Sequence, residues 1–186
     1  MVNIIGNIKI HPKNSNIIYV AVLGNIFGPN KERGVYKSTD GGKTWNKIHF
    51  ISNKTGARDV EINPSNPREI LASFWTVQRK PWTLVDGGNE GGIFLSKNEG
   101  KTWKKLKNGL PEGLIGKIEV EYSPVNSNRI WAMITAKEED EGGLYRSDNG
   151  GVSWKRINRD HKLRQRGWYY SHITADPKNE NIIYAS

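Results

Sequence analysis

The 186-residue chain contains no cysteine and no long apolar run. Without cysteine, disulfide bonds contribute nothing to stability, and the redox compartment cannot be inferred. The longest apolar run, residues 17–23, has the length of a β-strand and is far too short to span a bilayer. Helical periodicity is also missing, which excludes a predominantly helical fold. Residues 1–5 lack the basic and apolar regions of a signal peptide, and we expect no membrane contact by this segment.

Positive charge is abundant but dispersed. The chain carries 28 Lys and Arg against 19 Asp and Glu, a formal net charge of +9. Many basic residues follow a repeated tryptophan: Lys47, Lys104, Lys105, Lys107, Lys155 and Arg156. That position is typical of a solvated edge strand, where lysine discourages sheet-to-sheet association. A nucleic-acid surface needs a clustered basic stripe or a known module, so we expect no nucleic-acid partner.

Motifs for metals, cofactors and nucleophilic catalysis are missing as well. The histidines are scattered without metal-ligand spacing, at His11, His49, His161 and His172. No glycine-rich phosphate loop follows a strand and opens a helix, and no serine lies in a nucleophile elbow. We therefore expect no metal and no cofactor.

One eight-residue segment occurs three times, at 38–45, 96–103 and 147–154. Its copies keep Ser at position 1, Asp or Asn at 3, Gly at 5, Thr or Ser at 7 and Trp at 8. An Asp or Asn in a tight turn accepts hydrogen bonds from N–H groups a residue or two ahead, and the glycine supplies a positive φ. The tryptophan gives the returning strand an apolar anchor. Position 4 tolerates Glu99, which suggests that only the second glycine is required.

These segments resemble the Asp-box (BNR) repeat, S-x-D-x-G-x-T-W, of sialidases, xyloglucanases and sortilin-type receptors. In that family the box is a structural turn remote from the active site. The resemblance therefore implies a structural role for the fixed positions: Ser38, Asp40, Gly42, Thr44, Trp45, Ser96, Asn98, Gly100, Thr102, Trp103, Ser147, Asn149, Gly151, Ser153 and Trp154.

A second repeat, Pro-x-Asn, alternates with the boxes. Its prolines stand at 12, 64, 124 and 177, with spacings of 52, 60 and 53 residues. A period near fifty indicates a solenoid, a propeller or an array. Each period contains an alternating run before the proline, an apolar run after it, a third run that opens on glycine and a fourth that opens on the box tryptophan. Four short strands without a helix predict a β-propeller blade.

The predicted fold class is all-β, a β-propeller fragment of four-stranded antiparallel blades. We expect blade 1 at 1–56, blade 2 at 57–115, blade 3 at 116–169, and the first strands of blade 4 at 170–186. A closed propeller needs roughly 4–8 blades. We therefore interpret the chain as part of one larger domain that needs the remaining blades of its own protein.

The connections predict where a ligand binds. In a propeller the loops alternate between two faces, so the boxes and Pro-x-Asn turns share one face. The long connections at 24–33, 76–91, 136–142 and 158–169 share the other, and such insertions usually carry function. Their arginines and aromatics suit sugar stacking, peptide binding or carboxylate capture. We expect a shared concavity there, surrounded by Arg58, Arg79, Trp82, Arg164, Arg166, Trp168, Tyr169, Tyr170 and His172. In the alternative, the aromatics only anchor loops and the arginines pair with the acidic run 138–141.

Polar and apolar residues alternate along the strand before each proline. The polar positions are Asn7, Asp59, Glu119 and His172, and, two places further on, Lys9, Glu61, Glu121 and Thr174. This period of two predicts two stacked polar rings that face a wide, wet tunnel; alternatively, these residues only hydrogen-bond between blades. Candidate catalytic carboxylates are Asp59, Glu61, Glu119 and Glu121, with Asp86 outside the strand, and no spacing singles out the pair that a glycosidase needs.

The loops that carry Arg79 and Trp82 and the run 164–170, together with the segments at 24–29 and 108–113, are similar to those of bacterial sortilin-like BNR proteins, often named glycosyl hydrolases. This resemblance covers nearly the whole chain. The resemblance implies an exported propeller (periplasmic, cell-surface or secreted) that binds a carbohydrate or a peptide or protein ligand on its loop face and in its central tunnel. The main alternative is a glycoside hydrolase similar to the xyloglucanases. A third is an assembly role like that of the BNR propellers that assist photosystem assembly. A sialidase is disfavoured, because the Arg-Ile-Pro signature and a convincing arginine triad are missing.

Overall fold

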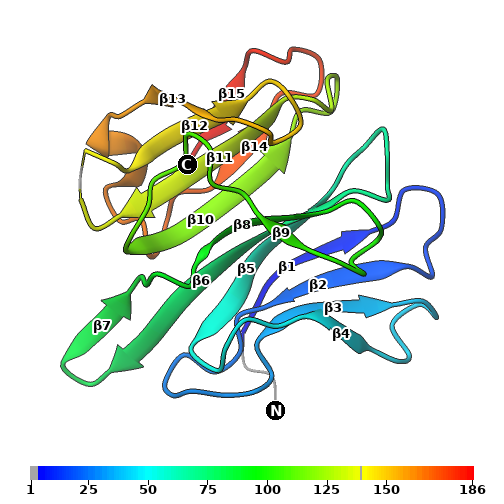
Figure 1. The fold of residues 1–186 in the computed structure, drawn as a ribbon, viewed down its shortest axis with the longest axis horizontal. Coiled ribbons are helices and arrows are strands. Elements are labelled where there is room, and N and C mark those ends of the chain that lie inside the picture. The colour runs from blue at the N-terminus through cyan, green and yellow to red at the C-terminus, as the bar shows by residue number, and fades with distance from the viewer. Residues whose placement is uncertain (1–3, 139) are drawn as a thin grey trace.

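The computed structural model describes residues 4–138 and 140–186, and these residues form antiparallel β-sheets in chain order (Figure 1). The strands of the first sheet are β1 (Ile5–Ile10), β2 (Ile18–Val22), β3 (Gly34–Ser38) and β4 (Asn46–His49). The second sheet contains β5 (Thr55–Ile62), β6 (Ile70–Lys80), β8 (Gly92–Ser96) and β9 (Lys104–Lys105), and β7 (Thr83–Asp86) pairs with β6. The third sheet contains β10 (Ile115–Tyr122), β11 (Ile130–Ala136), β12 (Gly143–Ser147) and β13 (Lys155–Asn158), and β14 (Ile173–Ala175) pairs with β15 (Ile183–Ala185).

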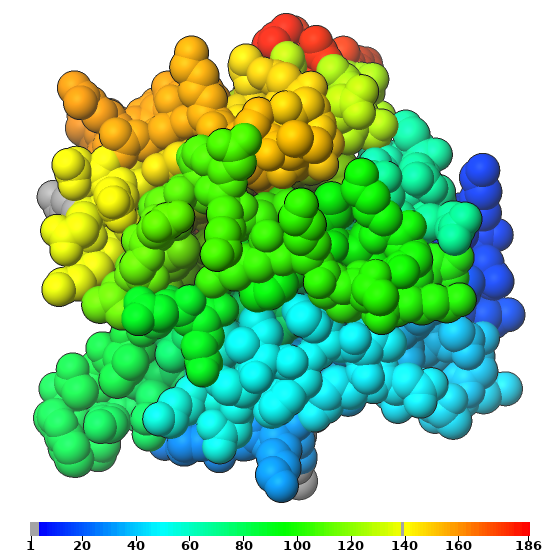
Figure 2. Space-filling model, in the orientation of Figure 1, coloured from blue at the N-terminus to red at the C-terminus, as the bar shows by residue number. Residues whose placement is uncertain are grey.

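This arrangement confirms the all-β propeller fragment. Within the described residues the one helical element is a single 3₁₀ turn, η1 (His161–Arg164). No helix in that part of the chain is long and apolar enough to cross a membrane. Successive sheets pack on one another, so the colours follow chain order from the first sheet to β15 across the space-filling view (Figure 2).

The three eight-residue segments that resemble the Asp-box, called boxes below, form nearly identical turns. The serine at position 1 accepts a hydrogen bond from the N–H at position 5, at 2.8, 2.8 and 2.9 Å in the three copies. The Asp or Asn at position 3 accepts from the N–H at position 7, at 2.9 Å each time. The expected acceptance from one or two residues ahead is therefore wrong, because the carboxylate or amide spans four residues and closes the whole turn. The glycine at position 5 has the expected positive φ, between 86° and 89°.

Position 4 of the box also requires the left-handed region of φ. Gly41 and Gly150 have φ of 73° and 66°, and Glu99 has φ of 60°. Position 4 therefore accepts a residue other than glycine, as expected from Glu99, but at an energetic cost, because a side chain at φ near 60° is unfavourable. Glu99 is held there by its N–H donating to the Arg68 carbonyl (2.8 Å) and by its carboxylate pairing with Lys37 (3.2 Å).

The two repeats are parts of one unit. In every described sheet that has a box, a carbonyl of the Pro-x-Asn turn accepts the N–H of box position 4: Asn16 from Gly41, Arg68 from Glu99 and Asn128 from Gly150. The asparagine of each turn accepts an N–H two residues ahead, at 2.9–3.4 Å. Box and turn therefore lie together at the same end of each sheet, on one face of the propeller.

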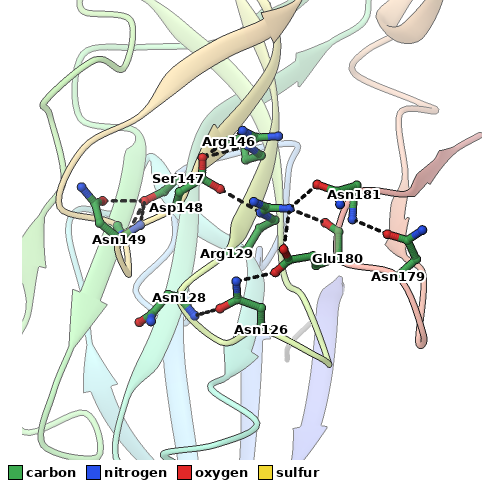
Figure 3. A network of polar contacts seen from close by, with 11 residues as sticks. Asn126, Asn128, Arg129, Arg146, Ser147, Asp148, Asn149, Asn179, Glu180 and Asn181 are labelled. Carbon is green, nitrogen blue, oxygen red and sulfur yellow. Dashed lines mark hydrogen bonds and ion pairs between the residues drawn. The ribbon is translucent and has the colours of Figure 1, made fainter.

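The same face carries the joint between the third sheet and β14–β15 (Figure 3). Arg129 pairs with the box residue Asp148 at 2.8 Å. Its guanidinium also donates to the Glu180 carbonyl at 3.1 Å and to Asn181 Oδ1 at 2.6 Å, and Asn126 donates to the Glu180 carboxylate. One arginine thus ties a box to two successive Pro-x-Asn turns.

The apolar core lies between neighbouring sheets. Between the first and second sheets it contains Tyr19, Ala21, Phe74 and Phe94, and between the second and third it contains Leu71, Ile93, Ile118 and Tyr145. The box tryptophans differ in their share of this core: Trp154 is 6% exposed, whereas Trp45 is 41% exposed. The expectation that every box tryptophan is a buried anchor is therefore wrong for Trp45, since no sheet covers its side of the first sheet in the described chain.

Candidate functional site

Several of the long connections meet at a hollow of about 630 Å³ on the face opposite the boxes. We call it the aromatic groove; it is lined by Ile4, Ile5, Gly6, Leu23, Ile26, Phe27, Arg58, Trp75, Val77, Arg79, Leu84, Lys117, Trp168 and Tyr169. The lining comes from all three complete sheets and from the segment before β14. The sequence brings these segments to one place because loops of the same parity share one face of a propeller.

One wall of the groove is a β-hairpin. The connection 76–91 was expected to be a loop, but β6 extends to Lys80 and turns tightly into β7, with Val77 paired to Asp86. The run Thr76-Val77-Gln78 continues the β-forming composition of β6, which the expectation overlooked. Trp75 Nε1 donates to Asp86 Oδ1 at 2.9 Å and fixes the base of the hairpin. The hairpin places Val77, Arg79 and Leu84 along the groove.

The opposite wall is an aromatic cluster that follows η1. Both Tyr169 and Tyr170 donate their N–H groups to the Arg166 carbonyl at 2.8 Å, which fixes this segment as a turn. Trp168 meets Tyr169 edge-on at 5.3 Å between ring centroids, and Tyr169 meets Tyr170 at 4.8 Å. Trp168 and Tyr169 line the groove and are 44% and 60% exposed, so both rings are available as stacking surfaces.

Three cations line the same groove. Arg79 is exposed, and its guanidinium has no hydrogen-bond or ion-pair partner among the described residues. Lys117 is buried and donates to the Tyr170 carbonyl at 2.6 Å, and burial lowers its pKa. Arg58 donates to the Gly6 carbonyl at 3.1 Å. The groove thus combines apolar and aromatic walls with positive charge, an arrangement that suits a ligand with an apolar or ring body and an acidic or hydroxyl group.

A second hollow, of about 410 Å³, adjoins the groove at Gly6 and Arg58, which line both. We call it the carboxylate pocket. All eight polar positions predicted from the alternation line it: Asn7, Lys9, Asp59, Glu61, Glu119, Glu121, His172 and Thr174. The period-2 pattern therefore identified which side chains of β1, β5, β10 and β14, and of the residue before β14, share one wall.

Glu119 is the charge centre of the pocket. Its Oε1 pairs with Arg58 Nη2 and with Lys117 Nζ at 3.2 Å, and it lies 3.5 Å from His172 Nδ1. Burial, together with the neighbouring Asp59, raises the pKa of Glu119 to about 7. Burial and the same cations lower the pKa of His172, so this imidazole is neutral near pH 7. Near neutral pH the carboxyl therefore exists in both protonation states.

The remaining pocket carboxylates cross-link neighbouring strands. Asp59 accepts from Asn7 Nδ2 at 2.5 Å, from the Val60 N–H at 2.9 Å and from the Val120 N–H at 3.0 Å. Glu61 pairs with Lys9 at 2.7 Å, and burial raises its pKa well above the ordinary value. These bonds join the innermost strands of three successive sheets, as the alternative of hydrogen bonding between blades predicted.

The other candidate ligand residues do not line the groove. Trp82 is 79% exposed at the tip of the β6–β7 hairpin. Arg164 is buried against Gly142, Arg166 is exposed after η1, and Tyr170 lies beside the groove lining. Of the acidic run 138–141, Glu139 lies outside the described residues. The structure thus brings Arg58, Arg79, Trp168 and Tyr169 together in the groove and places His172 in the adjoining pocket.

Two important residues were not anticipated. Lys117 stands two places before Glu119 on β10, so extending the same alternation by one step would have found it. Trp75 is buried in β6 and reaches the groove only because β6 continues past the end of β8, which no residue spacing indicates. Among the described residues, no group of three His, Asp or Glu side chains is placed to hold a metal ion.

The chain was compared with known proteins. The family model named Sortilin-Vps10, described as sortilin, neurotensin receptor 3, matches residues 33–186. A xyloglucanase from Paenibacillus sp. is 27% identical over 174 residues, which is 88% of this chain and 15% of the relative. Sortilin from Rattus norvegicus is 29% identical over 137 residues, which is 72% of this chain and 14% of the relative. The chain therefore spans about a seventh of the length of these relatives.

Solved structures with the same fold include glycoside hydrolases. The GH74 xyloglucanase from Xanthomonas campestris superposes with a TM-score of 0.67 at 17% identity, covering 96% of this chain and 26% of that one. An ancestral GH74 enzyme superposes with a TM-score of 0.65 at 20% identity, covering 94% and 21%. At these identities the likeness establishes the fold alone.

Proposed function

Because the chain belongs to the sortilin-Vps10 family, we propose that it is part of an exported β-propeller that binds a peptide or carbohydrate ligand in the aromatic groove. The observation that carries this proposal is the composition of the groove: the exposed rings of Trp168 and Tyr169 face a hollow that also contains Arg79, a cation with no ion-pair partner among the described residues. A hollow of this kind with few, convergent polar groups is the usual form of a ligand site.

The roles follow from the chemistry of each side chain. Trp168 and Tyr169 act as stacking platforms for a sugar ring or an apolar side chain. Arg79 donates to a carboxylate or hydroxyl group of the ligand, and this contact breaks no ion pair within the part of the chain that the structure describes. Arg58 and Lys117 supply further positive charge at the floor, where the groove meets the carboxylate pocket.

A titration followed by tryptophan fluorescence tests the proposal. The probes are a mixture of short peptides with free carboxyl ends and, separately, xyloglucan oligosaccharides. We expect Arg79→Ala and Trp168→Ala each to weaken binding of one probe by at least about tenfold, since one charged or stacking contact contributes on the order of 1–2 kcal/mol. The matched control is Arg166→Ala, an exposed arginine on the same segment outside the groove. Equal affinity of all three variants and the parent chain would contradict the proposal.

A second function, glycoside hydrolysis, is favoured by Glu119. A carboxyl whose pKa lies near 7 has the property that a general acid needs at neutral pH. Its neighbour Asp59 already accepts three hydrogen bonds from the protein, so it is poorly suited as the second carboxylate. Release of reducing ends from xyloglucan, abolished by Glu119→Gln, would support this function over simple binding.

A further inference from the structure

The side of the first sheet that faces away from the second sheet is apolar and open. Residues of β1, β2 and β3 and of the first box surround a hollow of about 480 Å³ there, among them Ile8, Ile18, Val20 and Trp45. Ile8 is 52% exposed, although apolar and polar residues alternate along β1 as in a strand with one buried face. We call this side the open face.

The corresponding side of the other sheets is buried. The positions equivalent to Ile18 and Val20 are Ile70 and Ala72 in the second sheet and Ile130 and Ala132 in the third, and all four are fully buried. The first sheet covers the second at these positions, and the second covers the third. The open face is therefore the same surface as the two internal joints, without its cover.

Both internal joints contain the same contact. At the first joint, an added Cβ on the box glycine Gly100 would overlap with Cδ1 of Ile48 from the preceding sheet. At the second joint, a Cβ on Gly151 would lie 3.1 Å from Cδ1 of Leu106 from the preceding sheet. A branched aliphatic side chain thus fills the space that the box glycine leaves free.

The aliphatic residue has a fixed place in its own sheet. Ile48 stands three places after Trp45, and Leu106 stands three places after Trp103. In the first sheet, a Cβ on Gly42 would meet only Trp45 at 3.4 Å and Ile18 at 3.9 Å, both from its own sheet. The glycine of the first box is therefore a socket of the same kind with no residue in it among those described.

We propose that the open face binds a further Asp-box blade of the same polypeptide, one that carries an aliphatic residue three places after its box tryptophan and presses that residue onto Gly42. The length of the relatives supports this source, since the chain spans only 15% of the xyloglucanase and 14% of the sortilin that it resembles. In this proposal the box glycine has two functions: it closes its own turn, and it receives the preceding blade.

A second copy of this chain fits the open face less well. Its own aliphatic residue at the matching place is Ile157, which is 39% exposed. However, β14 and β15 already pack on the side of the third sheet that would have to meet the open face, against Trp131, Met133 and Leu144. The innermost strand β1 of the receiving chain would therefore collide with β14 of the docked copy.

Matched glycine substitutions test the contact in the existing chain. Gly42, Gly100 and Gly151 have φ of 89°, 89° and 86°, so an alanine strains the backbone equally at all three. We expect Gly100→Ala to lower the melting temperature by about 3 °C or more beyond the effect of Gly42→Ala, with Gly151→Ala between them. Adding Ile48→Val, which removes the overlapping Cδ1, should recover part of the loss in Gly100→Ala. Equal falls in melting temperature at the three glycines would show that the aliphatic side chain of the preceding sheet does not press on the box glycine, and would overturn the proposal.

An extended chain tests the occupant. A second copy of residues 55–114 is placed directly before Ile5, so that its copy of Leu106 can reach Gly42. We expect the extended chain to bind less of an apolar dye than the original. In the extended chain, Gly42→Ala should lower the melting temperature as much as Gly151→Ala does. Replacing the copied leucine by glycine should remove this added effect of Gly42→Ala. An unchanged cost of Gly42→Ala would overturn the proposal. So would dimerisation of the original chain in sedimentation that Ile8→Asp abolishes, because the open face would then bind a second copy.

Discussion

The two faces of the molecule are built from the same sheets but behave very differently. On the box face, three turns repeat their hydrogen bonds to within about 0.1 Å, although only some of their residues are identical. On the loop face, three of the long connections differ in form: the loop 24–33, the β6–β7 hairpin and the η1 segment. The aromatic groove lies on this variable loop face.

The difference shows that the two faces of a repeat have different structural roles. The box face needs the same geometry in every blade, because it closes each outer hairpin and receives its neighbour. The loop face has no such constraint, so each connection is free to bring different side chains to one hollow. Substitutions on the box face should therefore mainly change the stability of the fold, because its residues are buried. Substitutions on the loop face should mainly change ligand binding, because its side chains are accessible.

The largest expected effect is at the box tryptophans. Trp154→Ala removes a ring that is buried between the second and third sheets, and we expect it to lower the free energy of unfolding by about 3–5 kcal/mol. Trp45→Ala removes the equivalent ring at the open face and should cost about 1 kcal/mol or less. Urea denaturation of both variants measures the difference. Similar losses would mean that the tryptophan stabilises its own turn rather than the joint.

The next effect concerns the carboxylate pocket. Asp59→Asn keeps the shape of the side chain but turns one acceptor oxygen into a donor that faces the Val120 N–H or the Asn7 amide. We expect a loss of about 1–3 kcal/mol, since a buried donor loses its acceptor. Glu121→Gln, on the same wall but half-buried, is the control and should stay within about 0.5 kcal/mol. If both variants cost the same, the pocket carboxylates act by charge rather than by cross-linking strands.

The fold and the residues of the carboxylate pocket could be predicted from the sequence. The period near fifty, the four strands in each period and the alternation on the innermost strand indicated the propeller and the eight pocket residues, because these features depend on local repetition. The β6–β7 hairpin and the positions of Arg164 and Trp82 could not be predicted. They depend on how far an inserted segment continues a strand and on what it packs against, and neither repeats along the chain.

The dependence of stability on pH tests the role of Glu119. Its pKa in the folded protein is about 7 against an ordinary value of 4.5, so the folded state binds more protons between these values. Stability from this group is therefore complete below pH 4.5 and is lost as the pH rises through about 7. Glu119→Gln should flatten the fall between pH 5 and 8 in the free energy of unfolding. The raised pKa of Glu61 acts in the same direction, so only the difference between the two proteins reports on Glu119.

The smallest effect separates the first box from the other two. Asp40 is the acidic version of the position that Asn98 and Asn149 occupy, and hydrogen bonds from the Thr44 hydroxyl and N–H are the main causes that lower its pKa to about 2. Asn98 makes the same turn by accepting the Thr102 N–H and donating to the Thr102 hydroxyl. Because a threonine hydroxyl can donate or accept, Asp40→Asn should shift the melting temperature at pH 7 by no more than about 2 °C.

The difference appears in acid. A carboxyl with a lowered pKa stabilises the folded state above its ordinary value of 3.8, and this stability is lost as the pH falls through about 2. We therefore expect the melting temperature of the parent chain to fall more steeply than that of Asp40→Asn between pH 4 and 2. Asn98→Asp is the reciprocal control and should steepen the fall, because its turn has the same hydrogen-bond geometry. Parallel curves for all three proteins would show that acid unfolding begins elsewhere, and that the three boxes are equivalent in charge as well as in shape.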